Sequence, residues 1–384
     1  MPSSTLRKTI FSLCFLAILI LSTGCGGGFS TVKVNQTPQT CGQCQFVYST
    51  TNSGEILTFP VSSTGALGTP TSVAGPANSA GIITLVPGGT QQVYLYVSDP
   101  GDNTIRVYNI ARNGSIAPAS VGPYPLGNAN GTAGELALFG TTLYVASSGG
   151  GISAFSVNSD GSLATVAGSP FAAGVGLSHL AVIPSETVAN TTFLYAANTD
   201  DANGSISAFN IRPNGALAPV AGSPFATVPG GGPAGFYDGG KILYVALQNA
   251  NGVAALNIAD DGSLTPVAGS PFSAGHGTSS LTGADGFLFA TNNSDGTISS
   301  YSIDPFSGVL AEVSGSPFSA AVSSGDTLYV NGKLFVPDAS ANSITGFEPD
   351  LTTGAVASLT GSPYQAGAGP LSLTIMQFPA FDPP

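Results

Sequence analysis

Residues 193–225 read FLYAANTDDANGSISAFNIRPNGALAPVAGSPF and contain one full copy of the pattern that decides the fold. The copy begins with an apolar-aromatic core, Leu194-Tyr195-Ala196, and continues after a polar turn with Ile206-Ser207-Ala208-Phe209. Alternation with a period of two, in β-branched and aromatic residues, is typical of strands with two different faces. The Asn214-Gly215 pair that follows predicts a hairpin turn.

This pattern occurs seven times, and the aromatic residues of successive cores are 45 to 51 residues apart. The cores are Phe46-Val47-Tyr48, Leu95-Tyr96-Val97, Leu143-Tyr144-Val145, Leu194-Tyr195-Ala196, Leu243-Tyr244-Val245, Leu288-Phe289-Ala290 and Leu334-Phe335-Val336. The repeats start near residues 46, 94, 142, 193, 242, 287 and 333. Self-similarity at such a period is the signature of a repeat architecture.

Each repeat predicts four strands and no helix. A glycine turn precedes a third strand, five repeats then carry Gly-Ser-Pro-aromatic, and a weaker apolar segment closes the unit. Four strands per repeat predict an all-β, seven-bladed β-propeller over residues 46–377. Because the first repeat lacks an innermost strand, Pro370 to Ile375 must complete the first blade and close the ring. The Asp-Gly pairs between strands are interpreted as turns rather than calcium loops.

The two ends of the chain lie outside the predicted propeller. Residues 1–24 combine Arg7 and Lys8 with a short apolar run, as in a secretory signal peptide, and the run is short for a membrane span. Cys25 follows small residues as in a bacterial lipobox, which predicts lipidation and export to the periplasm or cell surface; an ordinary signal peptide is the alternative. Residues 25–45 are then a tether, and residues 378–384 an irregular tail.

Cys41 and Cys44 form a C-x-x-C pair within the tether. Such a pair can be a redox centre, half of a zinc site or a short disulfide. Zinc would need two more ligands, and the mature chain offers only two histidines, remote in sequence. A structural disulfide in an oxidising compartment is the favoured interpretation.

Charge excludes one class of function. All 20 acidic residues follow the signal peptide, against six basic ones there, so the mature chain carries about −14. Nucleic-acid binders need basic patches, so no nucleic-acid partner is expected. No cofactor is predicted either: calcium suits the acidity but has no supporting motif. A monomer is expected.

The repeat resembles the lactonase-type seven-bladed propellers, which include the 6-phosphogluconolactonases and the YVTN-repeat surface proteins. The resemblance covers residues 46 to about 377 and rests on the Leu-Tyr-Val core, the Ile-Ser-Ala-Phe strand and the Gly-Ser-Leu turn. These motifs build the scaffold, so they imply the fold strongly and the activity weakly.

Enzymatic members of that family often carry a Gly-Pro-His-His type motif on the innermost strands. The matching positions here are predicted to be Gly81, Glu135, His179, Gly235, Ser280, Ser324 and Ser372, with one histidine among them. Lactone hydrolysis needs a base for the water and donors for the oxyanion. Glu135 and His179, from neighbouring repeats, are therefore the candidate catalytic pair; a histidine satisfied by nearby backbone is the alternative.

A candidate binding surface lies on the face that carries the loops leading into the innermost strands. Its predicted residues are Glu55, Asp99, Asp102, Asp200, Asp201, Asp295, Asp338 and, near the mouth, His276. Arg106 is the only cation expected on this face, which would repel a phosphorylated sugar lactone. The sequence thus favours a binding scaffold at the cell envelope for a protein, glycan or cation. Hydrolysis of an uncharged lactone is the alternative, and a structural spacer in the envelope is a third hypothesis.

Overall fold

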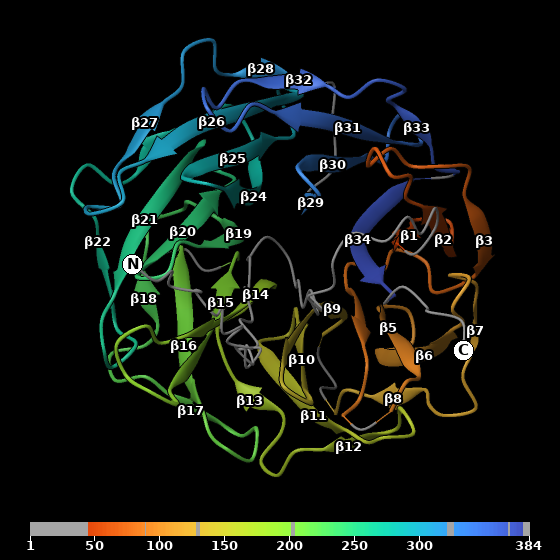
Figure 1. The fold of residues 1–384 in the computed structure, drawn as a ribbon. Helices are drawn as coiled ribbons and strands as arrows, with labels where there is room; N and C mark the ends of the chain where they lie inside the picture. The colour runs from red at the N-terminus through yellow and green to blue at the C-terminus, as the bar shows by residue number, and fades with distance from the viewer. Residues whose placement is uncertain are drawn as a thin grey trace, which may run out of the picture.

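The protein is described by a computed structural model covering residues 45–88, 90–127, 131–200, 204–320, 326–367 and 369–378. These residues form 34 strands in seven antiparallel sheets, which stand as blades around a common axis (Figure 1). No helix occurs within the described ranges, and so none there is long and apolar enough to cross a membrane. The predicted seven-bladed propeller is confirmed.

Three strands of every blade form its main body. The inner strands of blades 1 to 7 are β34 (Pro370–Gln377), β4 (Ile82–Leu85), β9 (Ala133–Phe139), β14 (Leu177–Pro184), β19 (Pro233–Asp238), β24 (Thr278–Ala284) and β29 (Leu328–Val330). The second strands are β1 (Gln45–Thr51), β5 (Val93–Asp99), β10 (Thr142–Ser147), β15 (Thr192–Asn198), β20 (Ile242–Leu247), β25 (Phe287–Asn292) and β30 (Lys333–Asp338). The third strands are β2 (Glu55–Pro60), β6 (Thr104–Ile110), β11 (Gly151–Val157), β16 (Ser205–Ile211), β21 (Gly252–Ile258), β26 (Thr297–Ile303) and β31 (Ser343–Pro349).

The outer edge of the blades is shorter. The outer strands are β3 (Thr71–Ala74), β7 (Ile116–Pro118), β12 (Leu163–Thr165), β17 (Leu217–Pro219), β22 (Leu264–Pro266), β27 (Leu310–Glu312) and β32 (Val356–Ser358). Blades 2 to 7 add a two-residue strand: β8 (Tyr124–Pro125), β13 (Phe171–Ala172), β18 (Phe225–Ala226), β23 (Phe272–Ser273), β28 (Phe318–Ser319) and β33 (Tyr364–Gln365).

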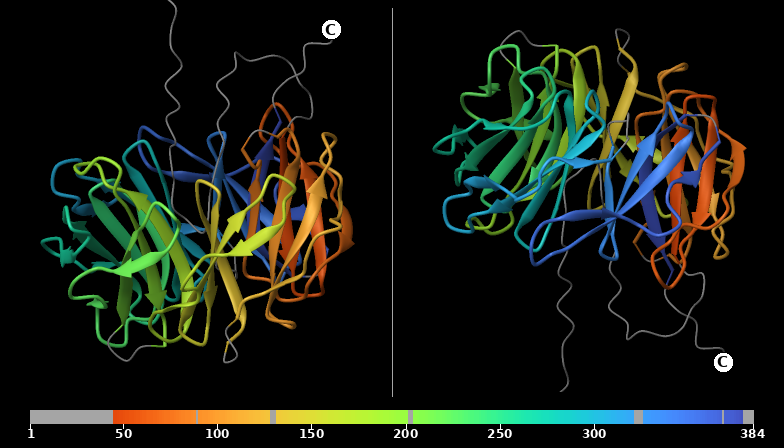
Figure 2. Two further views of the ribbon diagram at one scale, coloured as in Figure 1. Left: turned by 90° about the horizontal axis from the view of Figure 1, so that it is seen from below. Right: turned by 90° about the horizontal axis from the view of Figure 1, so that it is seen from above.

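The strands run between two faces of the ring (Figure 2). We call loop face the side with the loops between second and third strands and the loops leading into the inner strands. The opposite side, with the hairpins between inner and second and between third and outer strands, is the turn face. Apolar side chains fill the space between neighbouring blades, as in the cluster that joins Tyr195 of β15 to Val245 of β20.

The ring closes as predicted. The C-terminal strand β34 pairs with β1, so that Phe46 lies opposite Met376 and Tyr48 opposite Thr374. Just beyond the strand, Phe378 packs edge-on against Phe46 with the ring centroids 6.2 Å apart. The first and last segments of the described chain therefore share one blade.

The additional two-residue strand was not predicted, and in blades 3 to 7 it has its origin in the Gly-Ser-Pro-aromatic motif. Proline cannot donate to a ladder, so the outer strand ends before the motif, as expected. The aromatic residue then returns to the third strand: Phe225 lies opposite Ile206. The serine bridges the break, since Ser223 Oγ accepts the backbone N–H of Ala208 at 2.8 Å.

A buried tyrosine joins each of the first five blades to the next blade. The hydroxyls of Tyr48, Tyr96, Tyr144, Tyr195 and Tyr244 donate to the carbonyl oxygens of Gly114, Gly161, Gly215, Gly262 and Gly308, at 2.9–3.0 Å. Burial raises the pKa of all five tyrosines, so the hydroxyls stay protonated donors. The acceptor is the hairpin glycine between third and outer strands. At Gly262 (φ +84°) a Cβ would lie 2.4 Å from Phe193, so the blades touch too closely there for a side chain.

Blade 6 keeps the contact by a different residue. Its core aromatic is Phe289, which has no hydroxyl, but Ser300 on β26 donates from Oγ to the hairpin carbonyl of Gly354 in blade 7 at 2.7 Å. The acceptor is therefore satisfied in both versions of the contact.

Removal of either donor should weaken the ring. We expect Tyr195→Phe and Ser300→Ala each to lower the free energy of unfolding by about 1–2 kcal/mol, because a buried carbonyl loses its donor. Denaturant unfolding at equilibrium measures the change. Ser302→Ala, an exposed position on the same strand as Ser300, should stay within about 0.5 kcal/mol of wild type. Equal stability of all three variants would contradict the role of the tyrosine contact.

A chain ending at Gly369 should lose cooperative folding. Without β34, the edge of β1 and the apolar faces of blade 1 are exposed. A chain ending at Phe378 retains the strand and serves as the control. The two melting curves are compared by circular dichroism, and a shortened chain that melts like the control would rule out this closure.

Candidate functional site

One residue from each blade stands at the same level around the axis, and we call these seven residues the inner ring. The level is fixed by strand register: Ala181 lies opposite Tyr195 and Ala137 opposite Tyr144, which puts His179 and Glu135 in equivalent places two residues earlier. The inner ring consists of Ser372, Gly81, Glu135, His179, Gly235, Ser280 and Asp326.

The prediction was wrong for blade 7, where it named Ser324. The hairpin pairs Val330 with Lys333 and Leu328 with Phe335, so the residue equivalent to His179 is Asp326. Ser324 itself lies outside the described residues. The Asn331-Gly332 pair, with φ of 51° and 77°, is the two-residue turn from which the register could have been counted back.

Inner-ring side chains reach sideways to the next blade. Ser372 Oγ donates to the carbonyl of Ala80 at 2.7 Å. Where the ring residue is Gly81, an added Cβ would stand 2.4 Å from the carbonyl oxygen of Gly134. Bulges in the pairing of the inner strands, as between Leu177 and Leu180, allow this sideways direction.

The two carboxylates of the inner ring make the same contact in different blades. Glu135 Oε2 accepts the backbone N–H of Leu180 in the next blade at 2.8 Å. Asp326 Oδ2 accepts the N–H of Leu373 at 2.8 Å, and its Oδ1 accepts the N–H of Thr327, also at 2.8 Å. Each carboxyl therefore links two inner strands.

Burial sets the protonation of these groups. Desolvation raises the pKa of Glu135 well above its ordinary value. The hydrogen bond from Leu180 N–H lowers this pKa, and the charge of an ionised Asp326 raises it. Desolvation raises the pKa of Asp326 to about 7 and lowers that of His179 to about 4. At neutral pH the histidine is thus an uncharged base, and burial favours the acid form of Glu135.

Glu135 and His179 come from adjacent inner strands, but they are not bonded to each other. Glu135 Oε1 and His179 Nδ1 are both buried, and neither has a hydrogen-bond partner among the described residues. Glu135 is only 6% exposed, whereas His179 and Asp326 are partly exposed. Two polar atoms without partners at one level of the ring are costly unless a water or ligand satisfies them.

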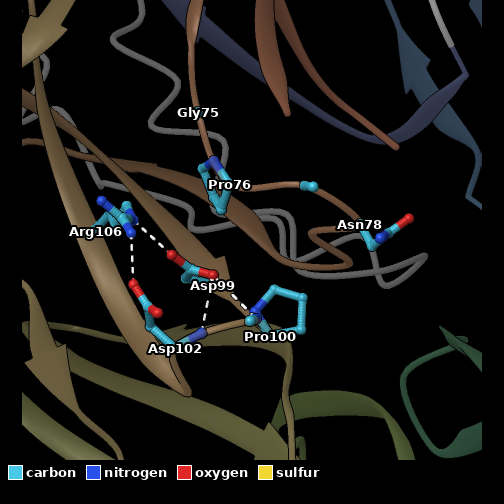
Figure 3. Close-up of a pocket in the computed structure, with 9 residues that line it drawn as sticks. Gly75, Pro76, Asn78, Asp99, Pro100, Asp102 and Arg106 are labelled. Carbon is cyan, nitrogen blue, oxygen red and sulfur yellow. Dashed lines mark hydrogen bonds and ion pairs between the residues drawn. The ribbon is translucent and has the colours of Figure 1, made fainter. Parts of the chain in front are cut away.

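The loop-face carboxylates are largely occupied by their own loops. Asp99 accepts the N–H groups of Gly101 and Asp102, and its Oδ2 lies 2.5 Å from Arg106 Nε. Asp102 lies 2.7 Å from the same guanidinium. The three side chains, with Pro76 and Asn78, line an open cleft of about 500 Å³ between blades 1 and 2 (Figure 3).

Two of the other predicted surface carboxylates also accept backbone N–H groups. Asp338 accepts the N–H groups of two residues of its own loop. Asp295 accepts the backbone N–H of His276 at 2.6 Å and lies 3.0 Å from its Nδ1. Asp200 packs against Gly176, where a Cβ would stand 2.5 Å from its Cγ. Asp201 lies outside the described residues.

Acidity is not confined to the loop face. The turn face carries further acids, and Asp160, Asp261, Asp304 and Asp350 each accept a backbone N–H within a hairpin. These contacts lower the pKa of all four carboxyls. The acids shape turns, as the sequence suggested for the Asp-Gly pairs.

No group of three or more histidine, cysteine or acidic residues in the described part of the chain is suited to hold a metal ion. The predicted lipidation site Cys25 and the Cys41–Cys44 pair lie outside the described residues.

Comparison with known proteins gives a consistent picture of the fold. The profile of the family "Lactonase, 7-bladed beta-propeller" matches residues 137–269. A candidate 6-phosphogluconolactonase from Bacteroides fragilis superposes with a TM-score of 0.71 at 20% identity, covering 89% of this chain and 100% of that one. The periplasmic gluconolactonase of Pseudomonas aeruginosa gives a TM-score of 0.69 at 19% identity, covering 87% and 99%. No curated protein sequence matches.

The raised pKa of Asp326 predicts a stability that falls with pH. A folded-state pKa of about 7, above the unfolded value, means that the folded chain holds this proton more tightly. Its contribution is present at acid pH and is lost as the pH rises through about 7. Between about pH 5 and 8 we expect a loss on the order of 2 kcal/mol, less than the full shift implies because the carboxyl is partly exposed.

The measurement is the melting temperature of wild type and Asp326→Asn across this pH range. The asparagine variant should show a flatter profile. Asp160→Asn, at an exposed hairpin where the pKa is lowered, should follow wild type over the same range. Parallel profiles for wild type and Asp326→Asn would contradict the burial of an ionisable carboxyl in the inner ring.

Proposed function

We propose that this chain, which belongs to the lactonase-type seven-bladed β-propellers, hydrolyses an uncharged lactone at the inner ring. The observation that carries the proposal is the pair of buried, unpartnered atoms, Glu135 Oε1 and His179 Nδ1, at one level of adjacent inner strands. A base and an acid at one level, both lacking partners, suit a ligand that occupies the ring.

The chemistry follows from the charge states of the two groups. Neutral His179 takes a proton from the water that attacks the lactone carbonyl carbon. The ring C–O bond of the tetrahedral intermediate then breaks, and the leaving alkoxide takes the proton of Glu135, which gives a hydroxy acid. The imidazolium and carboxylate recover their starting states by exchanging the proton through water. Catalytic hydrogen bonds are often absent without substrate, so the unbonded pair is compatible with this role.

Electrostatics favour an uncharged substrate. Among the described residues of the loop face the only basic side chain of Lys or Arg type is Arg106, and Asp99 and Asp102 engage it. A phosphorylated lactone would meet carboxyl groups without a free cation to bind it. The periplasmic gluconolactonase of similar fold acts, by its name, on an unphosphorylated lactone.

The proposed place of action is outside the cytoplasm. The basic and apolar pattern of residues 1–24 supports export, and Cys25 supports a lipid anchor on the membrane. The propeller would then be held near the membrane by residues 25–45, in the periplasm or at the cell surface.

The scaffold reading of the sequence is the second candidate. The cleft beside Arg106 favours it, since an open loop-face cleft of about 500 Å³ could receive part of a protein or glycan. Against it, the carboxylates around the cleft are engaged with their own loop and with Arg106, so little charge is left for a partner.

The proposal is tested by measuring the hydrolysis of glucono-1,5-lactone. A pH-stat records the acid that is released, and the rate of spontaneous ring opening is subtracted. His179→Ala should lower kcat by about 10²–10⁴-fold, and Glu135→Gln by a similar factor, because each removes a proton-transfer group. The matched control is His276→Ala, at an exposed histidine of the loop face, which should keep wild-type activity. Activity that survives His179→Ala would remove the site assignment, and an inactive wild type would favour the scaffold.

A further inference from the structure

We propose that Asp326 acts in its acid form as the hydrogen-bond donor to the lactone carbonyl oxygen, an inference that rests on the hydrolysis proposed above. Ester hydrolysis needs such a donor, since negative charge develops on that oxygen as water attacks. His179 and Glu135 serve the proton transfers, so the proposed mechanism has no donor yet for the carbonyl oxygen.

Position is the first argument. Asp326 stands at the same level of the inner ring as His179 and Glu135, by strand register. Between Asp326 and Glu135 the ring residues are the small Ser372 and Gly81, so no bulky ring side chain separates the two carboxyls.

Access is the second argument. Glu135 is 6% exposed, whereas Asp326 is partly exposed and a ligand can reach it. Asp326 is therefore accessible to a substrate.

Orientation is the third argument. Leu373 N–H binds one carboxyl oxygen of Asp326 and Thr327 N–H binds the other, both at 2.8 Å. Two bonds fix the plane of the carboxyl before any ligand arrives, and both are bonds that the carboxyl accepts. The proton of the acid form takes no part in them and is available to a ligand. A preorganised donor of this kind loses little energy in reorganisation during the reaction.

Desolvation favours the acid form of Asp326 and outweighs the N–H groups of Leu373 and Thr327, which lower its pKa. The inner strands on either side, β24 and β34, carry no titratable side chain. On β30 the charged residues lie at the two ends: Lys333 pairs with Glu348, and Asp338 binds its own loop. The adjacent ring residues are Ser280 and Ser372, which carry no charge. The other titratable ring residues are Glu135 and His179, and neither brings a positive charge at neutral pH. A buried carboxylic acid that donates to an oxyanion is a known device.

Two substitutions separate a donor from a base. Asparagine keeps an N–H donor and does not ionise, but its amide nitrogen cannot accept one of the two backbone N–H groups that the carboxyl binds. Asp326→Asn should therefore lose some activity but stay well above Asp326→Ala. Asp326→Ala removes the donor and should lower kcat by about 10²–10³-fold. Wild-type activity should decline above about pH 7 as Asp326 ionises, and Asp326→Asn should lack this alkaline decline. Ser280→Ala, another ring position, is the control and should leave the pH profile unchanged.

The outcomes are distinct. If the wild type hydrolyses lactone and depends on His179, but its activity does not decline above about pH 7, or a folded Asp326→Asn keeps that decline, then Asp326 is not the donor and the inference fails alone. Full activity of Asp326→Ala also overturns the inference alone. If the wild type hydrolyses no lactone, the proposed function fails and this inference fails with it.

Discussion

The hydrogen bond from a buried tyrosine hydroxyl to a hairpin glycine of the next blade is the contact on which the arrangement of the ring depends. It joins groups 64 to 71 residues apart in the chain, from Tyr48–Gly114 to Tyr244–Gly308. Apolar contacts between sheets have no direction and tolerate sliding. A hydroxyl that must reach one carbonyl does not tolerate sliding, so the bond fixes the height of each of the first five blades relative to the next.

Equal height has a consequence at the axis. When blades stand level, equivalent residues of the inner strands face each other sideways, and one residue per blade can contact the next strand. Small residues such as Gly81 fit against the neighbouring backbone, whereas Glu135 replaces that contact by a bond to Leu180 N–H. The ring can thus exchange a steric contact for an ionisable one without changing the scaffold, which is how one fold can carry different sites.

The scaffold could be predicted because the same pattern of strands and turns occurs seven times in the sequence. It predicted the wrong residue in blade 7 because β29 is only three residues long and offers little pattern to count. It also did not show that the loop-face acids, such as Asp99 and Asp338, bind their own loops, since a side chain that caps a loop and one that binds a ligand look alike in a sequence. Burial, which separates Glu135 from Asp326, depends on all the blades at once and has no local signature.

Carboxyl groups and a histidine in one inner ring offer different proton-transfer chemistry. Histidine in such a place loses its charge on burial, and His179 does so, with a pKa near 4. A buried carboxyl gains a proton instead, so Asp326, with a pKa of about 7, offers a donor where a histidine would offer an acceptor. Both groups are uncharged below neutrality, which lets them share one desolvated ring without the cost of burying ions. Below neutrality the ring therefore combines an uncharged proton acceptor, His179, with an uncharged proton donor, Asp326.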